Sequence, residues 1–270
     1  MSIKLVAIDI DGTLITDKGE ITTKVYEAIQ KAKAQGVKIV LTTGRPLTGV
    51  HSLLDYLQLK DIDDFVITYN GGLLQEVKTG KEIARYSLTY DNYLEIEMWA
   101  RKLNVHMHAI TNDAIYTANR DISRFSVREA TLVNMPLKYR TPEEMTSDLE
   151  IVKTMYIDET DYLTEIIQKF PAHLKEKYAT VRSAPSYFEI LNSKASKGNA
   201  LLVLSKKLNI NNEEIMAIGD AENDLSMLKV AGLGVAMENA VTEVKKEADV
   251  KTSSNNDNGV AVALEKYVLK

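Results

Sequence analysis

The sequence predicts an α/β protein that combines a doubly wound parallel sheet with an inserted α+β domain. Over residues 1–85 and 189–270, short apolar strand runs alternate with helical patterns, which is typical of a parallel sheet covered by helices. Over residues 86–188 the two patterns mix without a regular repeat, and four of the five prolines fall in this part. We therefore expect a discontinuous core, residues 1–85 and 189–270, interrupted by an α+β domain at residues 86–188.

The first strand run, residues 4–8, ends in the acidic turn Asp9-Ile10-Asp11-Gly12-Thr13. Ligands of open α/β sheets bind at the carboxyl ends of the strands, so this turn is expected at a binding edge. Asp-Gly pairs are also ordinary turn formers, and the turn alone leaves both interpretations open. A calcium loop of the helix-loop-helix type is excluded because Leu14 stands where that loop requires glycine.

The other core elements follow in the order of a doubly wound sheet. Right-handed crossovers bring the carboxyl ends of successive parallel strands to one edge. In the first helix, Val25, Ile29, Ala32 and Ala28 form the apolar face, and Gly36 ends it. The expected elements are a helix from Thr22 or Thr23, a strand at 37–41, a helix at 47–57, a strand at 65–68, a helix at 197–208, a strand at 215–219, a helix at 223–230, a strand at 233–236 and a helix at 260–268.

In the inserted domain, the clearest element is a helix at residues 91–103. Its spacing predicts that Leu94, Met98 and Leu103 face inward, with the only tryptophan, Trp99, beside them. His106 and His108 alternate along a strand and are expected to be structural. The expected strands of this domain are residues 105–110, 114–117, 151–157 and 180–183.

Three further polar stretches stand where a strand run ends or a helix begins. They are Thr42-Thr43-Gly44-Arg45, Ser196-Lys197-Gly198 and Gly219-Asp220-Ala221-Glu222-Asn223-Asp224. Together with the acidic turn, this ordered set resembles the signature of the haloacid dehalogenase superfamily of phosphohydrolases. The insert between Thr43 and Lys197 resembles the large cap of the Cof-type (IIB) subfamily. Within that subfamily the wording, for example Leu41-Thr-Thr-Gly-Arg-Pro46, is similar to the YidA-type sugar phosphatases.

The resemblance implies a Rossmann-like catalytic core with a substrate-specificity cap, and a phosphatase that forms an aspartyl-phosphate. By this resemblance, Asp9 is the nucleophile and Asp11 the general acid and base. The metal is Mg²⁺, bound by Asp9, the backbone carbonyl of Asp11 and Asp220, with Asp224 either a ligand or behind the ligands. The residues expected to bind phosphate are Thr43, Gly44, Lys197 and Asn223. The residues expected to contact the rest of the substrate are Tyr116, Asn119, Arg120 and Asp121. Arg45 could contact phosphate or pin its own loop, and we favour the second role.

Composition excludes several other classes. The net charge of −5 and the lack of basic clusters argue against nucleic acid as a partner. The absence of cysteine excludes disulfides and thiolate chemistry. No apolar run approaches the roughly 20 residues that span a bilayer, and no leader is evident, so we expect a cytoplasmic protein whose partner is a small phosphate ester. A homo-oligomer stays open.

Two alternative functions are left open by the sequence. A phosphomutase or phosphotransferase would use the same core, although mutases with an acid at the position of Asp11 typically carry a small helical cap before the Thr43 stretch. A catalytically idle sensor of phosphorylated metabolites would need neither a nucleophile nor an acid. A dehalogenase is disfavoured because that chemistry lacks the acid at Asp11, and a transport ATPase would require membrane spans.

Overall fold

A computed structural model describes residues 2–269, which form two compact units. The first unit contains residues 2–44, Val50–Arg85 and residues 196–269, and the second contains Arg45–Gly49 and Tyr86–Ala195. Residues 189–195, which the sequence analysis assigned to the core, belong to the second unit. The reason is that strand β11 (Tyr187–Asn192) pairs with β10 (Tyr178–Ala184) and β9 (Lys153–Ile157) of that unit.

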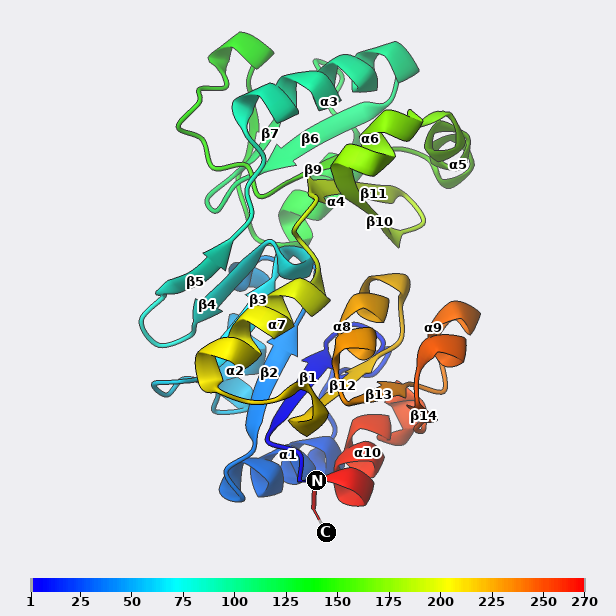
Figure 1. Cartoon of the computed structure of the whole chain (residues 1–270). Helices are drawn as coiled ribbons and strands as arrows, with labels where there is room; N and C mark the ends of the chain where they lie inside the picture. The colour runs from blue at the N-terminus through cyan, green and yellow to red at the C-terminus, as the bar shows by residue number, and fades with distance from the viewer. Residues whose placement is uncertain (1, 270) are drawn as a thin grey trace. The chain divides into compact units, whose positions relative to one another are not determined.

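The first unit is built on the predicted doubly wound sheet (Figure 1). Its eight strands lie in the order β14-β13-β12-β1-β2-β3-β4-β5. All pairs are parallel except those of β4 and β5, a hairpin at one edge that the sequence analysis missed. The strands are β1 (Leu5–Asp9), β2 (Lys38–Thr42), β3 (Phe65–Thr68), β4 (Leu73–Glu76), β5 (Glu82–Arg85), β12 (Ile215–Gly219), β13 (Leu233–Ala236) and β14 (Val250–Lys251).

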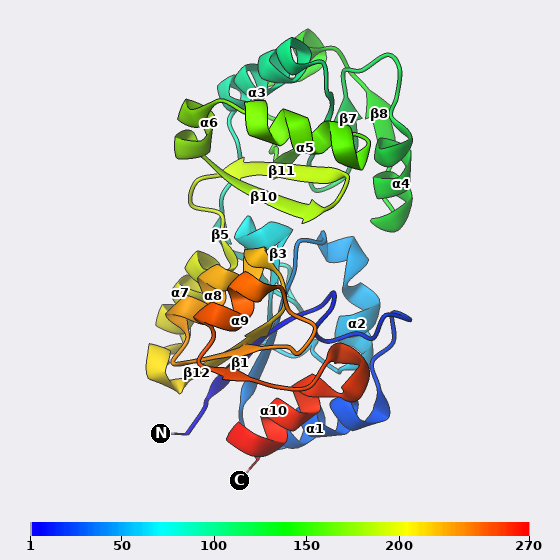
Figure 2. The same ribbon diagram turned by 90° about the vertical axis from the view of Figure 1, so that its right-hand side faces the viewer.

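Helices cover both faces of this sheet (Figures 1 and 2). Helices α1 (Thr23–Ala34) and α10 (Gly259–Tyr267) pack together on one face, and α7 (Lys197–Leu208) packs with α8 (Leu225–Val230) on the other. Helix α1 begins at Thr22, whose side chain accepts a hydrogen bond from the Val25 amide, and it buries the predicted apolar face. Two shorter helices are α2 (His51–Tyr56) and α9 (Thr242–Glu247). The single helix expected at residues 47–57 is divided into the 3₁₀ turn η1 (Leu47–Gly49) and α2.

The second unit is a six-stranded sheet with helices packed on it. The strand order is β10-β11-β9-β6-β7-β8, and every pair is antiparallel except β7 with β8. The remaining elements are β6 (His106–Ile110), β7 (Ile115–Thr117), β8 (Leu137–Tyr139), α3 (Tyr90–Leu103), α4 (Arg124–Leu132), α5 (Thr160–Lys169) and α6 (Ala172–Lys177). A large apolar cluster fills the space between one face of the sheet and helices α3, α5 and α6.

The inward face of α3 differs in part from the prediction, although Leu103 and Trp99 pack against the apolar cluster as expected. The helix buries Tyr93, Ile96 and Ala100, whereas Leu94 and Met98 are exposed. Both stripes have helical spacing, and the buried one is chosen by the sheet beneath it, since Tyr156 on β9 donates a hydrogen bond to the Ile96 carbonyl at 2.7 Å. Helical spacing alone could not separate the two faces.

The start of α7 lies against the turn that follows β3. Gly71 in this turn has φ +91°, and a Cβ atom there would lie 2.1 Å from the Ser196 carbonyl oxygen. Both the backbone conformation and the close approach therefore require glycine at this position.

We expect Gly71→Ala to lower the free energy of unfolding by about 3 kcal/mol or more, measured by urea denaturation, because it adds a clash to an unfavourable φ. The matched control is Gly80→Ala. Gly80 also has a positive φ, +68°, but nothing lies within 4 Å of its added Cβ. That control should cost only about 1 kcal/mol. Equal losses for the two variants would contradict the close-approach argument.

Candidate active site

Strand β1 places Asp9 at the centre of the site. It lies between β12 and β2 and is buried along its whole length. Parallel register pairs Asp9 with Thr42, so the carboxyl ends of these strands lie side by side. Because β12 pairs with the other edge of β1, the turn after Gly219 reaches the same place. Asp9 and Asp220, which are more than 200 positions apart, therefore meet at one sheet edge, together with Thr42.

The acidic turn packs directly against Asp220. Gly12 has φ +78°, and a Cβ atom there would lie 2.4 Å from Asp220 Oδ2. The hydroxyl of Thr13, a buried residue, donates a hydrogen bond to Asp220 Oδ1 at 2.8 Å. Glycine is thus required for a close contact, and Thr13 orients a carboxylate.

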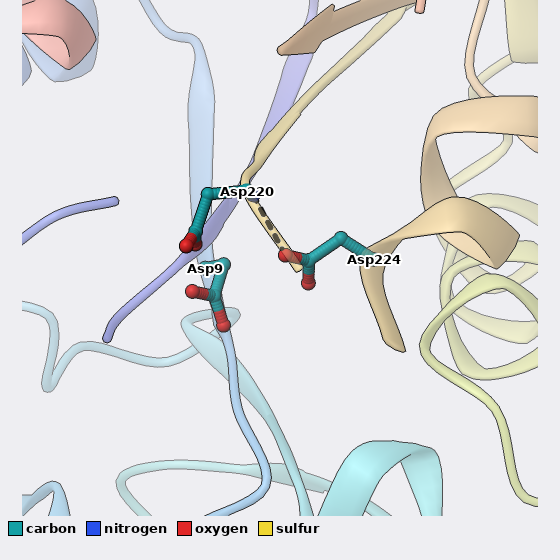
Figure 3. Close-up of side chains that lie close together, drawn as sticks. All are labelled: Asp9, Asp220 and Asp224. Carbon is teal, nitrogen blue, oxygen red and sulfur yellow. Dashed lines mark hydrogen bonds between the residues drawn. The ribbon is translucent and has the colours of Figure 1, made fainter. Parts of the chain in front are cut away.

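Three carboxyl groups converge at this edge (Figure 3). Asp9, Asp220 and Asp224 each offer one oxygen, and these oxygens all lie within 4.8 Å of one another. Asp9 and Asp224 are buried, and Asp220 is partly exposed. The backbone amides of Asp220 and Ala221 donate to Asp224 Oδ2 at 2.9 and 3.0 Å. Asp224 therefore holds the turn that carries Asp220.

Lys197 joins two of these carboxylates. Its Nζ donates to Asp9 Oδ1 and to Asp224 Oδ1, each at 2.5 Å, and its side chain is fully buried. It reaches this position because Ser196 caps the start of α7, where the Ser196 hydroxyl accepts a hydrogen bond from the Asn199 amide. Three carboxylates and one ammonium leave a formal charge of −2 in a buried space.

The pKa values reflect this excess of negative charge. Burial raises the pKa of Asp9 well above its usual value, and the charge of Asp224 raises it further while Lys197 opposes the shift. Burial, and then Asp224, raise the pKa of Asp220 to about 6. Burial opposes the charge on Lys197, but Asp224 and Asp9 outweigh it, so the pKa of this ammonium is raised. Asp9 and Asp220 therefore keep their protons to a higher pH than an ordinary aspartate does, and a further cation beside them would lower both pKa values.

The residues fit a divalent cation. Carboxylate oxygens are the donors that hard cations prefer, and a charge of +2 would balance the −2 of the cluster. Asp9 and Asp220 are better placed as ligands than Asp224, because Lys197 and two backbone amides already bind the oxygens of Asp224.

The expected phosphate-binding residues lie around the ends of β2 and β3. Thr43 is buried, and its carbonyl oxygen accepts a hydrogen bond from the Asn70 amide at 2.9 Å. The side chain of Asn70 lies against Gly44, where a Cβ atom would come within 3.1 Å of it. Asn70 Oδ1 also accepts from Asn223 Nδ2 at 2.9 Å. Asn70 thus connects Thr43, Gly44 and Asn223.

Sequence reasoning missed Asn70 and Thr13 as site residues. Thr13 stands inside the acidic turn, and Asn70 belongs to the Asn-Gly-Gly stretch that follows β3, so a signal was present for both. Asn70 adopts a left-handed backbone conformation, φ 55°, in the turn η2 (Tyr69–Gly71). Asn-Gly is also an ordinary turn sequence, so its presence alone does not indicate a role for the Asn70 side chain.

Asp11 is not part of the carboxylate cluster. It is exposed, and its backbone forms a parallel bridge with Ile15 at the far side of the turn. The contact expected of it with a metal uses its backbone carbonyl, so the direction of the side chain does not bear on that contact. Arg45 donates to the Gly49 carbonyl oxygen at 3.2 Å, as expected of a residue that pins its own loop.

The four expected substrate-contacting residues of the second unit do not gather at one place. Tyr116 is buried in the apolar cluster. The side-chain oxygen of Asn119 accepts from the Met107 amide at 2.9 Å and so holds β6. Asn119 and Arg120 line a surface cavity of about 830 Å³, whereas Asp121 is exposed outside it.

The two histidines of β6 have structural partners. His108 is buried between the Ser126 hydroxyl and the Met155 sulfur, and burial lowers its pKa to about 3. His106 contacts Asp158 at 2.9 Å. Within the same sheet, a buried ion pair joins Lys153 on β9 to Glu189 on β11 at 2.8 Å.

Comparisons with known proteins cover both units. The family model of haloacid dehalogenase-like hydrolases matches residues 6–264. A Streptococcus pyogenes protein named "Putative phosphatase M6_Spy0533" is 56% identical over 269 residues, which is 100% of either chain. "Putative phosphatase YxeH" of Bacillus subtilis is 46% identical over 266 residues, 98% of either chain. The crystal structure of a haloacid dehalogenase-like hydrolase from Bacteroides thetaiotaomicron superimposes with a TM-score of 0.84 at 30% identity, covering 98% of this chain and 99% of that one.

Among residues 2–269, no helix is both long enough and apolar enough to cross a bilayer.

We expect metal binding to weaken in acid, because a metal must displace the proton that Asp220 holds. The pKa of Asp220 is about 6 in the folded protein, against an ordinary value of 3.8. The folded, metal-free protein therefore binds this proton more tightly than the unfolded chain does. Its free energy of unfolding falls as the pH rises between these two pKa values. At about pH 5 the affinity for Mg²⁺ should be about tenfold lower than at about pH 7.5.

The measurement is the rise in melting temperature on adding Mg²⁺ at the two pH values. The rise should be larger at the higher pH, and Asp220→Asn should show little rise at either. Equal rises in the melting temperature of the unmodified protein at both pH values would contradict the assignment. Asp220 would then not be a metal ligand that must first lose a proton.

Proposed function

The chain belongs to the haloacid dehalogenase-like hydrolases and is a phosphoric monoester hydrolase, and on this premise we propose a Mg²⁺-dependent phosphatase of small phosphorylated metabolites, sugar phosphates among them. It acts through an aspartyl-phosphate on Asp9. The observation that carries the proposal is the buried cluster of Asp9, Asp220, Asp224 and Lys197, whose formal charge of −2 calls for a divalent cation beside the nucleophile.

In the proposed site, Asp9 and Asp220 hold Mg²⁺ by carboxylate oxygens and Asp11 by its backbone carbonyl, while Asp224 orients Lys197. The bound metal supplies positive charge that draws the substrate phosphate to Asp9 and stabilises the transition state. Lys197 adds a second positive charge beside Asp9, through its hydrogen bond to Asp9 Oδ1. Thr43, Gly44 and Asn223 add neutral donors, and Asn70 positions Asn223.

The chemistry then proceeds in two displacements. A carboxylate oxygen of Asp9 attacks phosphorus, the bond from phosphorus to the leaving oxygen breaks, and Asp11 gives that oxygen its proton. A water molecule next attacks the phosphorus of the aspartyl-phosphate, and Asp11 accepts a proton of this water. The bond from the Asp9 oxygen to phosphorus breaks, which restores the Asp9 carboxylate and releases inorganic phosphate. The exposed position of Asp11 suits a group that must exchange protons twice in each cycle.

We assign the second unit the role of a cap that selects the leaving group of the substrate. Its main segment is Tyr86–Ala195, rather than the expected residues 86–188. The carboxylate cluster found among residues 2–269 belongs wholly to the first unit, so the second unit has no comparable set of acids. This division places the catalytic acids in one unit and the selection of the substrate in the other. It is consistent with a phosphatase of small metabolites.

We expect Asp9→Asn to abolish phosphate release, with a fall on the order of a thousandfold or more, because the amide cannot attack phosphorus. The assay measures phosphate released from sugar phosphates, nucleotides and an aryl phosphate, with and without Mg²⁺. The matched control is Asp55→Asn, an exposed aspartate of α2 that pairs with Lys60. It should leave the rate unchanged.

Phosphate release that persists in Asp9→Asn would overturn the proposed mechanism. Transfer of phosphate between positions of a sugar, with little release, would favour the phosphomutase or phosphotransferase alternative. A folded protein that binds phosphorylated sugars but releases no phosphate from any of them would favour the sensor.

A further inference from the structure

The loop Asn255-Asn256-Asp257-Asn258-Gly259 makes contacts that the sequence analysis did not anticipate. It includes the turn η6 (Asn255–Asp257) and runs into α10. We propose that Asn255 and Asn239 are positioning residues, which hold the acidic turn at Gly12 and Ile15 in the shape that metal binding and catalysis require. The inference rests on the proposed function and adds two residues to it.

Asn255 holds the far end of the acidic turn. Asn255 is 4% exposed, and its Nδ2 donates to the Ile15 carbonyl oxygen at 3.0 Å and to Asp17 Oδ1 at 3.1 Å. Ile15 forms the bridge with Asp11, so this amide supports the strand-like pairing that closes the turn. A buried amide has to find partners, and here it finds them 240 positions away in the sequence.

Asn239 holds the middle of the turn. Its Nδ2 donates to the Gly12 carbonyl oxygen at 2.8 Å, and its Oδ1 accepts from the Asn255 amide at 3.0 Å. The two asparagines therefore form one chain of hydrogen bonds from the η6 loop to Gly12. The Gly12 carbonyl belongs to the peptide that joins Gly12 to Thr13, so its orientation bears directly on the Thr13 backbone, and the Thr13 hydroxyl binds Asp220. Gly12 is bonded on its other side to Asp11, so fixing Gly12 also restrains the Asp11 carbonyl.

The loop itself is anchored away from the site. The Thr22 hydroxyl, at the start of α1, donates to Asn258 Oδ1 at 2.6 Å, and α10 packs against α1. The support for the acidic turn thus comes from the packed pair of helices α1 and α10 in the first unit. Residues that orient metal ligands from behind commonly change affinity or activity by about 10- to 100-fold when they are replaced.

The decisive variant is Asn239→Asp, which keeps the size and the acceptor for Asn255 but removes the donor to Gly12. Asn239 is exposed, so the variant should fold and its metal-free melting temperature should stay close to that of the unmodified protein. We expect its dissociation constant for Mg²⁺, measured by calorimetry without substrate, to rise about tenfold or more, and kcat on an aryl phosphate to fall by a similar factor. Asn255→Ala should show the same pair of effects with some loss of stability.

The matched control is Asn256→Asp, which makes the same chemical change in the same loop. Asn256 is exposed and contacts Asp17 rather than the acidic turn. It should bind Mg²⁺ and turn over substrate as the unmodified protein does. Normal Mg²⁺ affinity and kcat in Asn239→Asp would overturn the inference, and so would an equal loss in Asn256→Asp. If the unmodified protein itself bound no Mg²⁺ and released no phosphate, the proposed function would fail, and the inference with it.

Discussion

The buried ion cluster around Lys197 is the constraint on which the site depends. An ammonium with no exposed surface is tolerated only because Asp9 and Asp224 both bind it at 2.5 Å. The same two carboxylates would be costly to bury without it. Together with Asp220, the cluster carries a formal charge of −2. Burial and the nearby charge of Asp224 raise the pKa of Asp220. A divalent cation bound to these carboxylates would balance the remaining charge of −2.

The scaffold brings these charges together through backbone features. Strand β1 delivers Asp9, the amides of the turn after β12 grip Asp224, and a capped helix start delivers Lys197. Glycine at position 12 lets the acidic turn reach Asp220. The side-chain amides of Asn70, Asn239 and Asn255 then connect the loops to one another. The strands and the helix start thus place the charged side chains of the site, and the asparagines hold the loops between them by hydrogen bonds.

The parts of the fold with local signals were predictable. Short apolar strands that end in acids indicated both the doubly wound sheet and the edge where Asp9 and Asp220 meet. The supporting residues were not predictable, because contacts such as Asn255 with Ile15 join positions 240 apart and leave only an ordinary loop composition in the sequence. The end of the insert was misplaced for a similar reason. Strand β11 resembles a core strand, and only its pairing with β9 and β10 assigns it to the second unit.

The most direct test of the central claim is to trap the covalent intermediate. The protein is incubated with acetyl phosphate and Mg²⁺ and quenched in acid, and its peptides are mapped by mass spectrometry. A phosphoryl group on the side chain of Asp9, absent without Mg²⁺ and absent in Asp9→Asn, is the predicted result. Steady release of phosphate from a protein in which Asp9 is never modified, or a phosphoryl group on another residue, would contradict the role of Asp9 as nucleophile.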